Sequence, residues 1–295
     1  MTSRALHTLL HTIVDYAGLF PPAGLSMDRA LALYASYQQS THAWMLARFV
    51  VPVARLDEFK HAMHVTGVPY ENPWRLSALL GDDAESDVTT VLAFNAAREQ
   101  AMIDALEVKA STTDAIDAIA RLVPPGMKVY VEIPIDRDPR ELVAALAQRR
   151  LRAKMRTGGV VPGAIPPSDQ VARFLRACYA AGVGFKATAG LHHPLRADQA
   201  LTYEPHSPRA VMHGSLNVFL AAALHYNGLT ARDTIDLLEM DTLDGVVMDD
   251  EKISWREYTV TVAELSTIRR RHAVSFGSCS FADPVDDLQT MGLLT

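Results

Sequence analysis

Short β-rich segments alternate with longer segments of helical periodicity along most of this chain. From residue 44 onward the alternation gives eight strand–helix pairs. Strands that alternate with helices of about 10–15 residues predict parallel βαβ units. Eight such units within about 250 residues match the size of a (β/α)8 barrel. The predicted strands lie in residues 44–52, 75–81, 104–110, 128–136, 151–159, 183–190, 243–250 and 273–281.

The same pattern predicts one domain. A doubly wound open sheet is the alternative, but no glycine-rich dinucleotide loop follows any predicted strand. We therefore expect residues 1–295 to form a single α/β domain, a TIM-type barrel over residues 44–295 with a helical extension over residues 1–43. The segment DYAGLFPPAG reads as a Pro/Gly loop in that extension. Its Asp15 and Tyr16 fit an ordinary surface turn better than a place at the barrel mouth.

Net charge and composition exclude several classes of partner and indicate where the protein is located. The net charge is −6, and the charged residues are interspersed, so a nucleic-acid partner is not expected. The two cysteines, Cys178 and Cys279, are too few for a disulfide scaffold. No run of about 18 apolar residues and no clear signal-peptide core is present, which predicts a cytoplasmic protein without a membrane partner. The oligomeric state is left open, with a homo-oligomer as one option.

Charged residues recur within the predicted strands, where apolar residues would be expected. Residues two apart in a strand point to the same side, and the residues of the opposite parity are apolar. The polar set would therefore face the barrel axis near the carboxyl ends of the strands, where barrel enzymes build their sites. This set comprises Arg48, Glu107, Lys109, Tyr130, Glu132, Lys154, Arg156, Lys186 and Thr188.

The composition of this set predicts an anionic ligand. Five cations face two acids, and arginine suits a carboxylate or a phosphate because it donates two hydrogen bonds. Backbone N–H groups after two strands could add to the site, from Thr157, Gly158 and Gly159 and from Gly277, Ser278 and Ser280. Cys279 lies at a predicted helix start, where the pKa of a thiol falls.

Amine chemistry is the first interpretation of the cluster. A lysine among cations and apolar walls has a depressed pKa and is partly nucleophilic near pH 7. Lys186 would be this nucleophile or base, tuned by Lys154, with Glu132 as proton shuttle. The segment AGVGFKATAG resembles the region of the Schiff-base lysine in class I aldolases of the deoxyribose-phosphate aldolase type. That family carries a second lysine on the next strand; residues 243–250 contain none, so Lys154 would take this part from the preceding strand.

Two other mechanisms and one non-catalytic role stay open. His192, His193 and His213, with Asp249 and Asp250, suggest metal-assisted hydrolysis or elimination with one divalent metal, although no metal-specific spacing is present. An isomerase or epimerase without cofactor would use the same lysines and glutamates in acid–base chemistry. A small-anion binding protein is the non-enzymatic alternative.

Motifs along the whole chain also resemble a family of uncharacterised bacterial proteins of about this length. They are VDYAGLFPPAGLSMD, KMRTGG, FKATAGLHHP, MHGSLNV and FGSCSF. The resemblance implies a single domain. The sequence thus predicts a lyase of aldolase type that acts on a small anionic carbonyl metabolite without a cofactor. Lys186, Lys154 and Glu132 would be catalytic, and His192 or His193 would assist. Arg48, Glu107, Lys109, Arg156 and Thr188 would bind the substrate.

Overall fold

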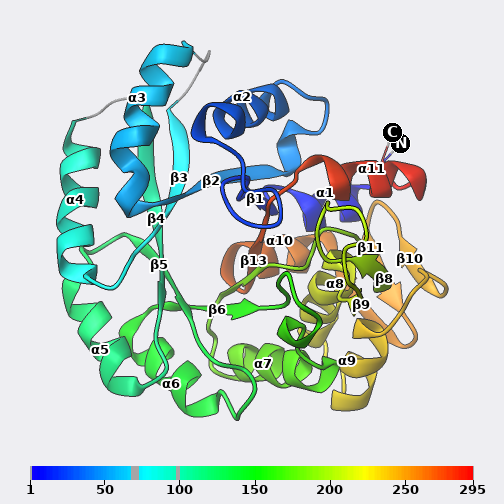
Figure 1. The fold of residues 1–295 in the computed structure, drawn as a ribbon. Helices are drawn as coiled ribbons and strands as arrows, with labels where there is room; N and C mark the ends of the chain where they lie inside the picture. The colour runs from blue at the N-terminus through cyan, green and yellow to red at the C-terminus, as the bar shows by residue number, and fades with distance from the viewer. Residues whose placement is uncertain (1, 68–72, 98–99, 295) are drawn as a thin grey trace.

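A closed barrel of eight parallel strands forms the centre of the molecule in the computed structural model, which describes residues 2–67, 73–97 and 100–294 (Figure 1). Around the barrel the strands follow the order β1-β13-β7-β6-β5-β4-β3-β2. The predicted (β/α)8 fold is therefore confirmed. The barrel strands are β1 (Val14–Tyr16), β2 (Leu46–Pro52), β3 (Trp74–Leu79), β4 (Ala101–Lys109), β5 (Lys128–Glu132), β6 (Arg152–Arg156), β7 (Phe185–Thr188) and β13 (Ala273–Ser278).

Helices surround the barrel and connect its strands, as Figure 1 shows. A helix follows each of the strands β1 to β6, and two follow β7 before the chain returns through α10 to β13. The helices are α1 (Arg4–Leu10), α2 (Met27–Gln38), α3 (Leu56–Thr66), α4 (Ala84–Ala96), α5 (Thr113–Leu122), α6 (Arg140–Arg149), α7 (Ser168–Ala180), α8 (Ser215–His225), α9 (Ala231–Leu238), α10 (Val262–Arg271) and α11 (Ala282–Thr290).

Two small antiparallel sheets lie outside the barrel. The long connection after β7 contains a hairpin of β8 (Ala197–Ala200) and β9 (Arg209–Met212). Between α9 and α10, β10 (Val246–Met248), β11 (Lys252–Trp255) and β12 (Tyr258–Thr261) form a three-stranded sheet. The prediction that residues 243–250 supply a barrel strand is therefore wrong. No residue of β10 is fully buried, as a barrel strand under a layer of helices would be, and β10 pairs with the next strand along the chain.

β1 takes the barrel position that residues 243–250 were expected to fill. It lies within residues 1–43, so the predicted boundary at residue 44 is also wrong, although α1 and α2 supply the expected helices. β1 pairs with β13 on one side and with β2 on the other and so closes the barrel. A strand of three residues is too short to show the alternation by which strands are recognised in a sequence.

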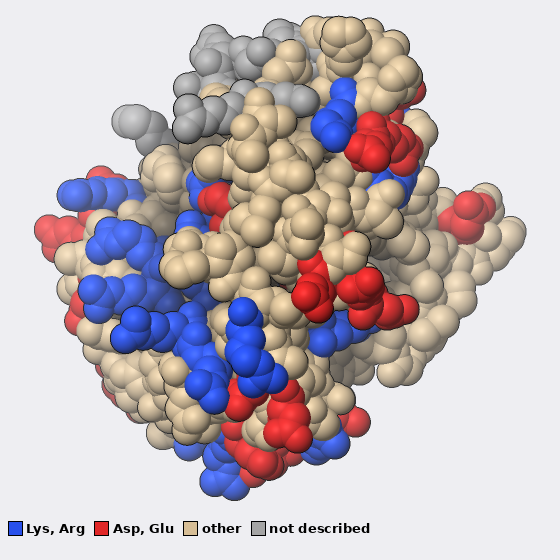
Figure 2. Space-filling model, turned by 90° about the vertical axis from the view of Figure 1, so that its left-hand side faces the viewer, with Lys and Arg blue, Asp and Glu red and all other residues tan. Residues whose placement is uncertain are grey.

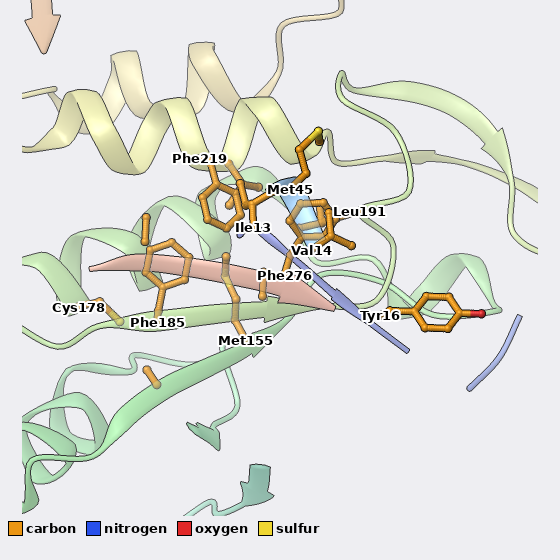
Figure 3. Packing of buried hydrophobic residues seen from close by; sticks show 14 of the residues in the cluster. Ile13, Val14, Tyr16, Met45, Met155, Cys178, Phe185, Leu191, Phe219 and Phe276 are labelled. Atoms are coloured by element: carbon orange, nitrogen blue, oxygen red, sulfur yellow. The ribbon is translucent and has the colours of Figure 1, made fainter. Parts of the chain in front are cut away.

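The apolar core fills the space between the strands and the surrounding helices. Phe219 of α8 packs against Phe185 of β7 and Phe276 of β13, with ring centroids 6.0 and 5.9 Å apart (Figure 3). On the side of α2, Tyr16 packs against Tyr34. Because the apolar side chains of the strands point outward into this layer, the side chains of opposite parity point into the barrel. That interior holds the charged residues.

Candidate active site

Lys186 is at the centre of the barrel interior, where it is 1% exposed. Its Nζ lies 2.7 Å from Asp15 Oδ2 and also contacts Glu107 Oε1. Asp15 is held in place by the strands on both sides of β1, since it accepts hydrogen bonds from the backbone N–H of Arg48 and from Ser275 Oγ. The lysine thus has two buried carboxylates as partners.

These partners determine the protonation state of Lys186. Burial by itself disfavours the ammonium form, but the charges of Asp15 and Glu107 outweigh burial and raise the pKa of Lys186 to about 12. The expectation of a depressed pKa at this lysine is therefore wrong. It assumed that cations surround Lys186, whereas the neighbours that contact it are carboxylates.

Lys154 lies beside Lys186 in the adjacent strand, and the two residues are register partners. Lys154 Nζ is 2.8 Å from Glu107 Oε2 and 2.9 Å from Glu132 Oε2. Glu107 also accepts a hydrogen bond of 2.6 Å from Ser77 Oγ. Although burial alone would raise the pKa of Glu107, Lys154 and Lys186 hold it well below its usual value. Both lysines therefore share one ionised carboxylate.

A cavity of about 720 Å³ opens at the carboxyl ends of β4, β5 and β6. Three of the residues predicted from the sequence line it, namely Lys109, Glu132 and Arg156. Arg156 Nε lies 3.4 Å from Glu132 Oε1, so Glu132 links the buried Lys154 to the cavity. Burial would raise the pKa of Glu132, but Lys154 and Arg156 lower it. Ser111, Asp136 and Gln170 provide further polar groups in the lining.

Arg48 lies on the other side of this network, away from the cavity. It is the third residue of β2, and its guanidinium forms two hydrogen bonds of 2.5 and 2.9 Å with Asp104. The prediction that Arg48 binds the substrate near the carboxyl end of its strand therefore needs correction. Together these contacts form a continuous alternation of charge through the barrel: Arg75, Asp104, Arg48, Asp15, Lys186, Glu107, Lys154, Glu132 and Arg156.

The segment Thr157–Gly159 follows β6 and packs against the turn that follows β7. Thr157 is fully buried, and its Oγ1 donates to the backbone oxygen of Ala189. A Cβ on Gly158 would lie 2.8 Å from Gly190 Cα, so the two chains cross in van der Waals contact. Thr188 accepts from the Thr157 N–H at its backbone oxygen. These contacts account for the glycines by packing, and neither Thr157, Gly158, Gly159 nor Thr188 lines the cavity.

The loop after β13, which was expected to add backbone N–H groups to the anion site, makes contacts within the protein. Ser280 Oγ accepts from the Asp283 N–H in the first turn of α11, while Ser278 Oγ lies 3.4 Å from His192 Nδ1. Gly277 lies beside Thr188 in the register of β13 and β7. Burial raises the pKa of the Cys279 thiol, which is opposite to the expectation from its place near a helix start.

The histidines of the long loop point to different partners. His193 Nδ1 lies 2.6 Å from Asp287 Oδ2, and His213 Nε2 lies 2.7 Å from the backbone oxygen of Pro166. His192 faces Cys279 and Ser278, and burial lowers its pKa. Within residues 2–67, 73–97 and 100–294, no three or more His, Cys, Asp or Glu side chains are placed to hold one metal ion.

The two aspartates of the metal hypothesis lie next to the first helix. Asp249 accepts from the backbone of Glu251 and Lys252, and Asp250 accepts from the Arg4 N–H. Among the residues predicted for the site, the structure therefore brings together Glu107, Lys109, Glu132, Lys154, Arg156 and Lys186.

Four members of the network escape prediction from the sequence, namely Asp15, Ser77, Asp104 and Ser275. Asp15 lies in the strand that is too short to recognise. Asp104 stands at an irregularity of the register between β3 and β4, which breaks the alternation of β4. Serine is common in loops and carries no charge, so Ser77 and Ser275 give little signal. No pattern in the sequence marks Asp15, because the three residues of β1 are too few to establish an alternation.

Comparison with known proteins gives no independent assignment. No protein-family model matches the sequence, and a search of curated proteins finds no significant similarity. None of the described helices is both long enough and apolar enough to cross a membrane. Inferences about function therefore rest on the site geometry.

Proposed function

We propose that this barrel is an enzyme of the lyase class that acts on a small anionic carbonyl compound through the amine of Lys154. The observation that carries the proposal is the position of Lys154. It bridges Glu107 deep in the barrel and Glu132 at the cavity. Of the two buried lysines, Lys154 is one contact away from the cavity. Lys186 lies behind Glu107 and is held as an ammonium ion.

The anion of the substrate would be bound by Lys109 and Arg156. Both line the cavity, and the Arg156 side chain is 49% exposed, so its guanidinium can donate to a carboxylate or a phosphate. Glu132 is 12% exposed and lies between these cations and Lys154. A carbonyl group next to the bound anion would reach Nζ of Lys154 when the Glu132 side chain turns away from it.

The covalent step balances with the residues present. The Lys154 ammonium gives one proton to Glu132, and the neutral amine adds to the carbonyl carbon. Glu132 returns the proton to the hydroxyl of the carbinolamine, which leaves as water, and an iminium ion remains. The iminium then accepts the electrons of the bond that breaks or forms at the neighbouring carbon. Lys186 stays protonated beside Glu107 and keeps that carboxylate ionised.

The proposal keeps only one part of the resemblance to class I aldolases, which by itself assigns the Schiff base to Lys186. That resemblance implies a second lysine on the strand after the Schiff-base lysine. In the barrel β7 follows β6, so Lys186 stands in this relation to Lys154. The roles first expected for the two residues are exchanged, with Lys154 as nucleophile and Lys186 as its charged neighbour.

Acid–base catalysis without an imine is a second candidate, and the charges around Lys154 favour it. Lys186 is held as an ammonium ion, and both carboxylates that contact Lys154 have lowered pKa values. Glu132 would then remove a proton next to the carbonyl, while Lys109 and Arg156 stabilise the enolate.

Trapping with sodium cyanoborohydride separates the two candidates. The protein is incubated with pyruvate or with dihydroxyacetone phosphate, reduced, and mapped by peptide mass spectrometry. We expect an adduct at Lys154 that is absent from Lys154→Met and unchanged in Lys252→Ala, a variant of an exposed lysine on β11.

Three other results would contradict the assignment of Lys154 as the nucleophile. An adduct at Lys186 in place of Lys154 would overturn the assignment of the nucleophile. If no adduct forms while the wild type exchanges the methyl protons of pyruvate in D2O and Glu132→Gln does not, the acid–base candidate replaces the imine. Absence of both adduct and exchange for these probes, together with no binding of either, would contradict a carbonyl substrate of this class.

A further inference from the structure

The amino-terminal mouth of the barrel carries a second group of cations, which the proposed function does not use. We call Arg75, Lys128 and Arg152 the basic mouth cluster. Arg75 is the second residue of β3, while Lys128 and Arg152 are the first residues of β5 and β6. Tyr130 and Arg152 are register partners, and so are Lys128 and Ala105 in the strand that carries Asp104. The three residues therefore lie at the same, amino-terminal end of the barrel.

A single carboxylate faces these cations among the described residues. Asp104 accepts two hydrogen bonds from Arg48 and two from Arg75, so its lone pairs are already used. Lys128 Nζ is 3.8 Å from Asp104 Oδ2. Within the part of the chain that the structure describes, no carboxylate lies within 4.0 Å of the Arg152 guanidinium, which sits 5.6 Å from the Tyr130 ring centroid. Arg48 has Asp15 as a second carboxylate, whereas the three cations of the basic mouth cluster have only Asp104, which they share with Arg48.

The excess of positive charge changes the pKa of Lys128. Burial lowers the pKa of Lys128, and repulsion from Arg48, Arg75 and Arg152 lowers it further against the attraction of Asp104. Structural ion pairs normally remove such repulsion because oppositely charged groups alternate, as they do deeper in this barrel. At the amino-terminal mouth the alternation of opposite charges ends, and the outermost side chains, Arg75, Lys128 and Arg152, are all cations.

The cluster is accessible to a solute. The side chains of Arg75 and Lys128 are 46% and 40% exposed, whereas Arg48 beneath them is 5% exposed and fixed by Asp104. Figure 2 shows a group of Lys and Arg side chains on the left and lower part of this face of the molecule, with Asp and Glu side chains beside them. An anion from solution can therefore approach donors that are already positioned.

We propose that the basic mouth cluster binds a phosphate-type dianion at the amino-terminal end of the barrel. Two guanidinium groups and one ammonium group supply donors from β3, β5 and β6, three of four consecutive strands in the barrel. A tetrahedral dianion accepts from several donors at once and neutralises most of the excess charge. The site is separate from the cavity at the carboxyl ends of the strands, and its existence does not depend on the proposed reaction.

Titration of the full chain with inorganic phosphate, followed by isothermal titration calorimetry, tests the proposal. We expect saturable binding that weakens about tenfold in Lys128→Ala and in Arg152→Gln, since each removes a charged donor. Arg209→Ala, at an exposed ion pair on β9, serves as the matched control. Arg156→Ala controls for phosphate in the opposite cavity and should retain the binding.

The controls make the result decisive. Circular dichroism establishes that the Lys128 and Arg152 variants are folded. If sodium chloride at equal ionic strength abolishes the phosphate heat, or if Lys128→Ala and Arg152→Gln bind as the wild type does, the cluster is an ordinary solvated surface. If binding is lost in Arg156→Ala and kept in Lys128→Ala, phosphate occupies the cavity, and the inference about the amino-terminal mouth is wrong.

Discussion

A buried ammonium group is stable only where carboxylates replace the water it has lost, and Lys186 has two such partners. The same two carboxylates stabilise its charged form and disfavour the neutral amine that a nucleophile requires. Lys154 shares Glu107 but has its second partner, Glu132, at the cavity. The two lysines therefore differ in their second carboxylate. That of Lys186 is the buried Asp15, whereas that of Lys154 is Glu132, which lines the cavity.

Glu107 is the residue on which both lysines depend, and its removal gives the sharpest prediction at this scale. Glu107→Gln leaves two buried cations with one carboxylate fewer and should lower the free energy of unfolding by about 3–5 kcal/mol. The pKa of Glu107 is depressed in the folded state, so its stabilisation is present above the ordinary value of 4.5 and is lost as the pH falls below it. Urea unfolding of both proteins between pH 7 and pH 3.5 measures this.

The gap between wild type and Glu107→Gln should therefore be constant near neutral pH and shrink below about pH 4.5. Glu58→Gln, which breaks an exposed pair with Arg55, is the matched control and should change stability by less than about 1 kcal/mol. A gap that persists undiminished at pH 3.5 would mean that Glu107 is not held ionised by the lysines.

At the scale of elements, the motif KMRTGG combines two separate tasks. β6 presents Lys154 to the interior and Arg156 to the cavity, and the glycines that follow let the chain cross the turn after β7. The glycine pattern was expected to bind phosphate with backbone N–H groups. The contacts with Gly190 explain the same pattern by close packing, because a side chain at Gly158 has no room.

Gly158→Ala tests this explanation. The new Cβ would lie 2.8 Å from Gly190 Cα, and backbone atoms cannot yield as a flexible side chain can. We expect a loss of about 1–3 kcal/mol in the free energy of unfolding. Gly163→Ala is the control, since nothing lies within 4 Å of its Cβ, and it should stay within about 0.5 kcal/mol. Equal stability of the two variants in chemical denaturation would refute the packing role.

For the whole molecule, closure of the barrel depends on the three residues of β1. Without them β2 and β13 would have unpaired edges, and Lys186 would lose Asp15. A chain that starts at residue 44, the barrel boundary expected from the sequence, should therefore lack a cooperative urea transition and a near-ultraviolet dichroism signal. A cooperatively unfolding monomer of residues 44–295 would contradict this. The full chain, measured under the same conditions, is the control and should show both the cooperative transition and the dichroism signal.

The sequence by itself determined the class of fold, because the alternation of strand and helix periods is local and repeats many times. It also placed charges on the inward faces of β4 to β7, since parity along a strand is a local property. Seven of the eight predicted strands proved to be barrel strands for this reason. The exposed segment of residues 243–250 and the very short β1 were assigned wrongly because their barrel membership depends on pairing.

Only the tertiary structure decided which charges meet. Asp15 and Lys186 are 171 positions apart in sequence and 2.7 Å apart in the barrel. Whether a lysine is surrounded by cations or by carboxylates depends on such contacts, and so does its pKa. The residues predicted from the sequence to face the interior comprise five cations and two acids. The structure shows that Asp15 and Asp104 also contact these cations. Electrostatic energy depends on distances between strands, which no local pattern encodes.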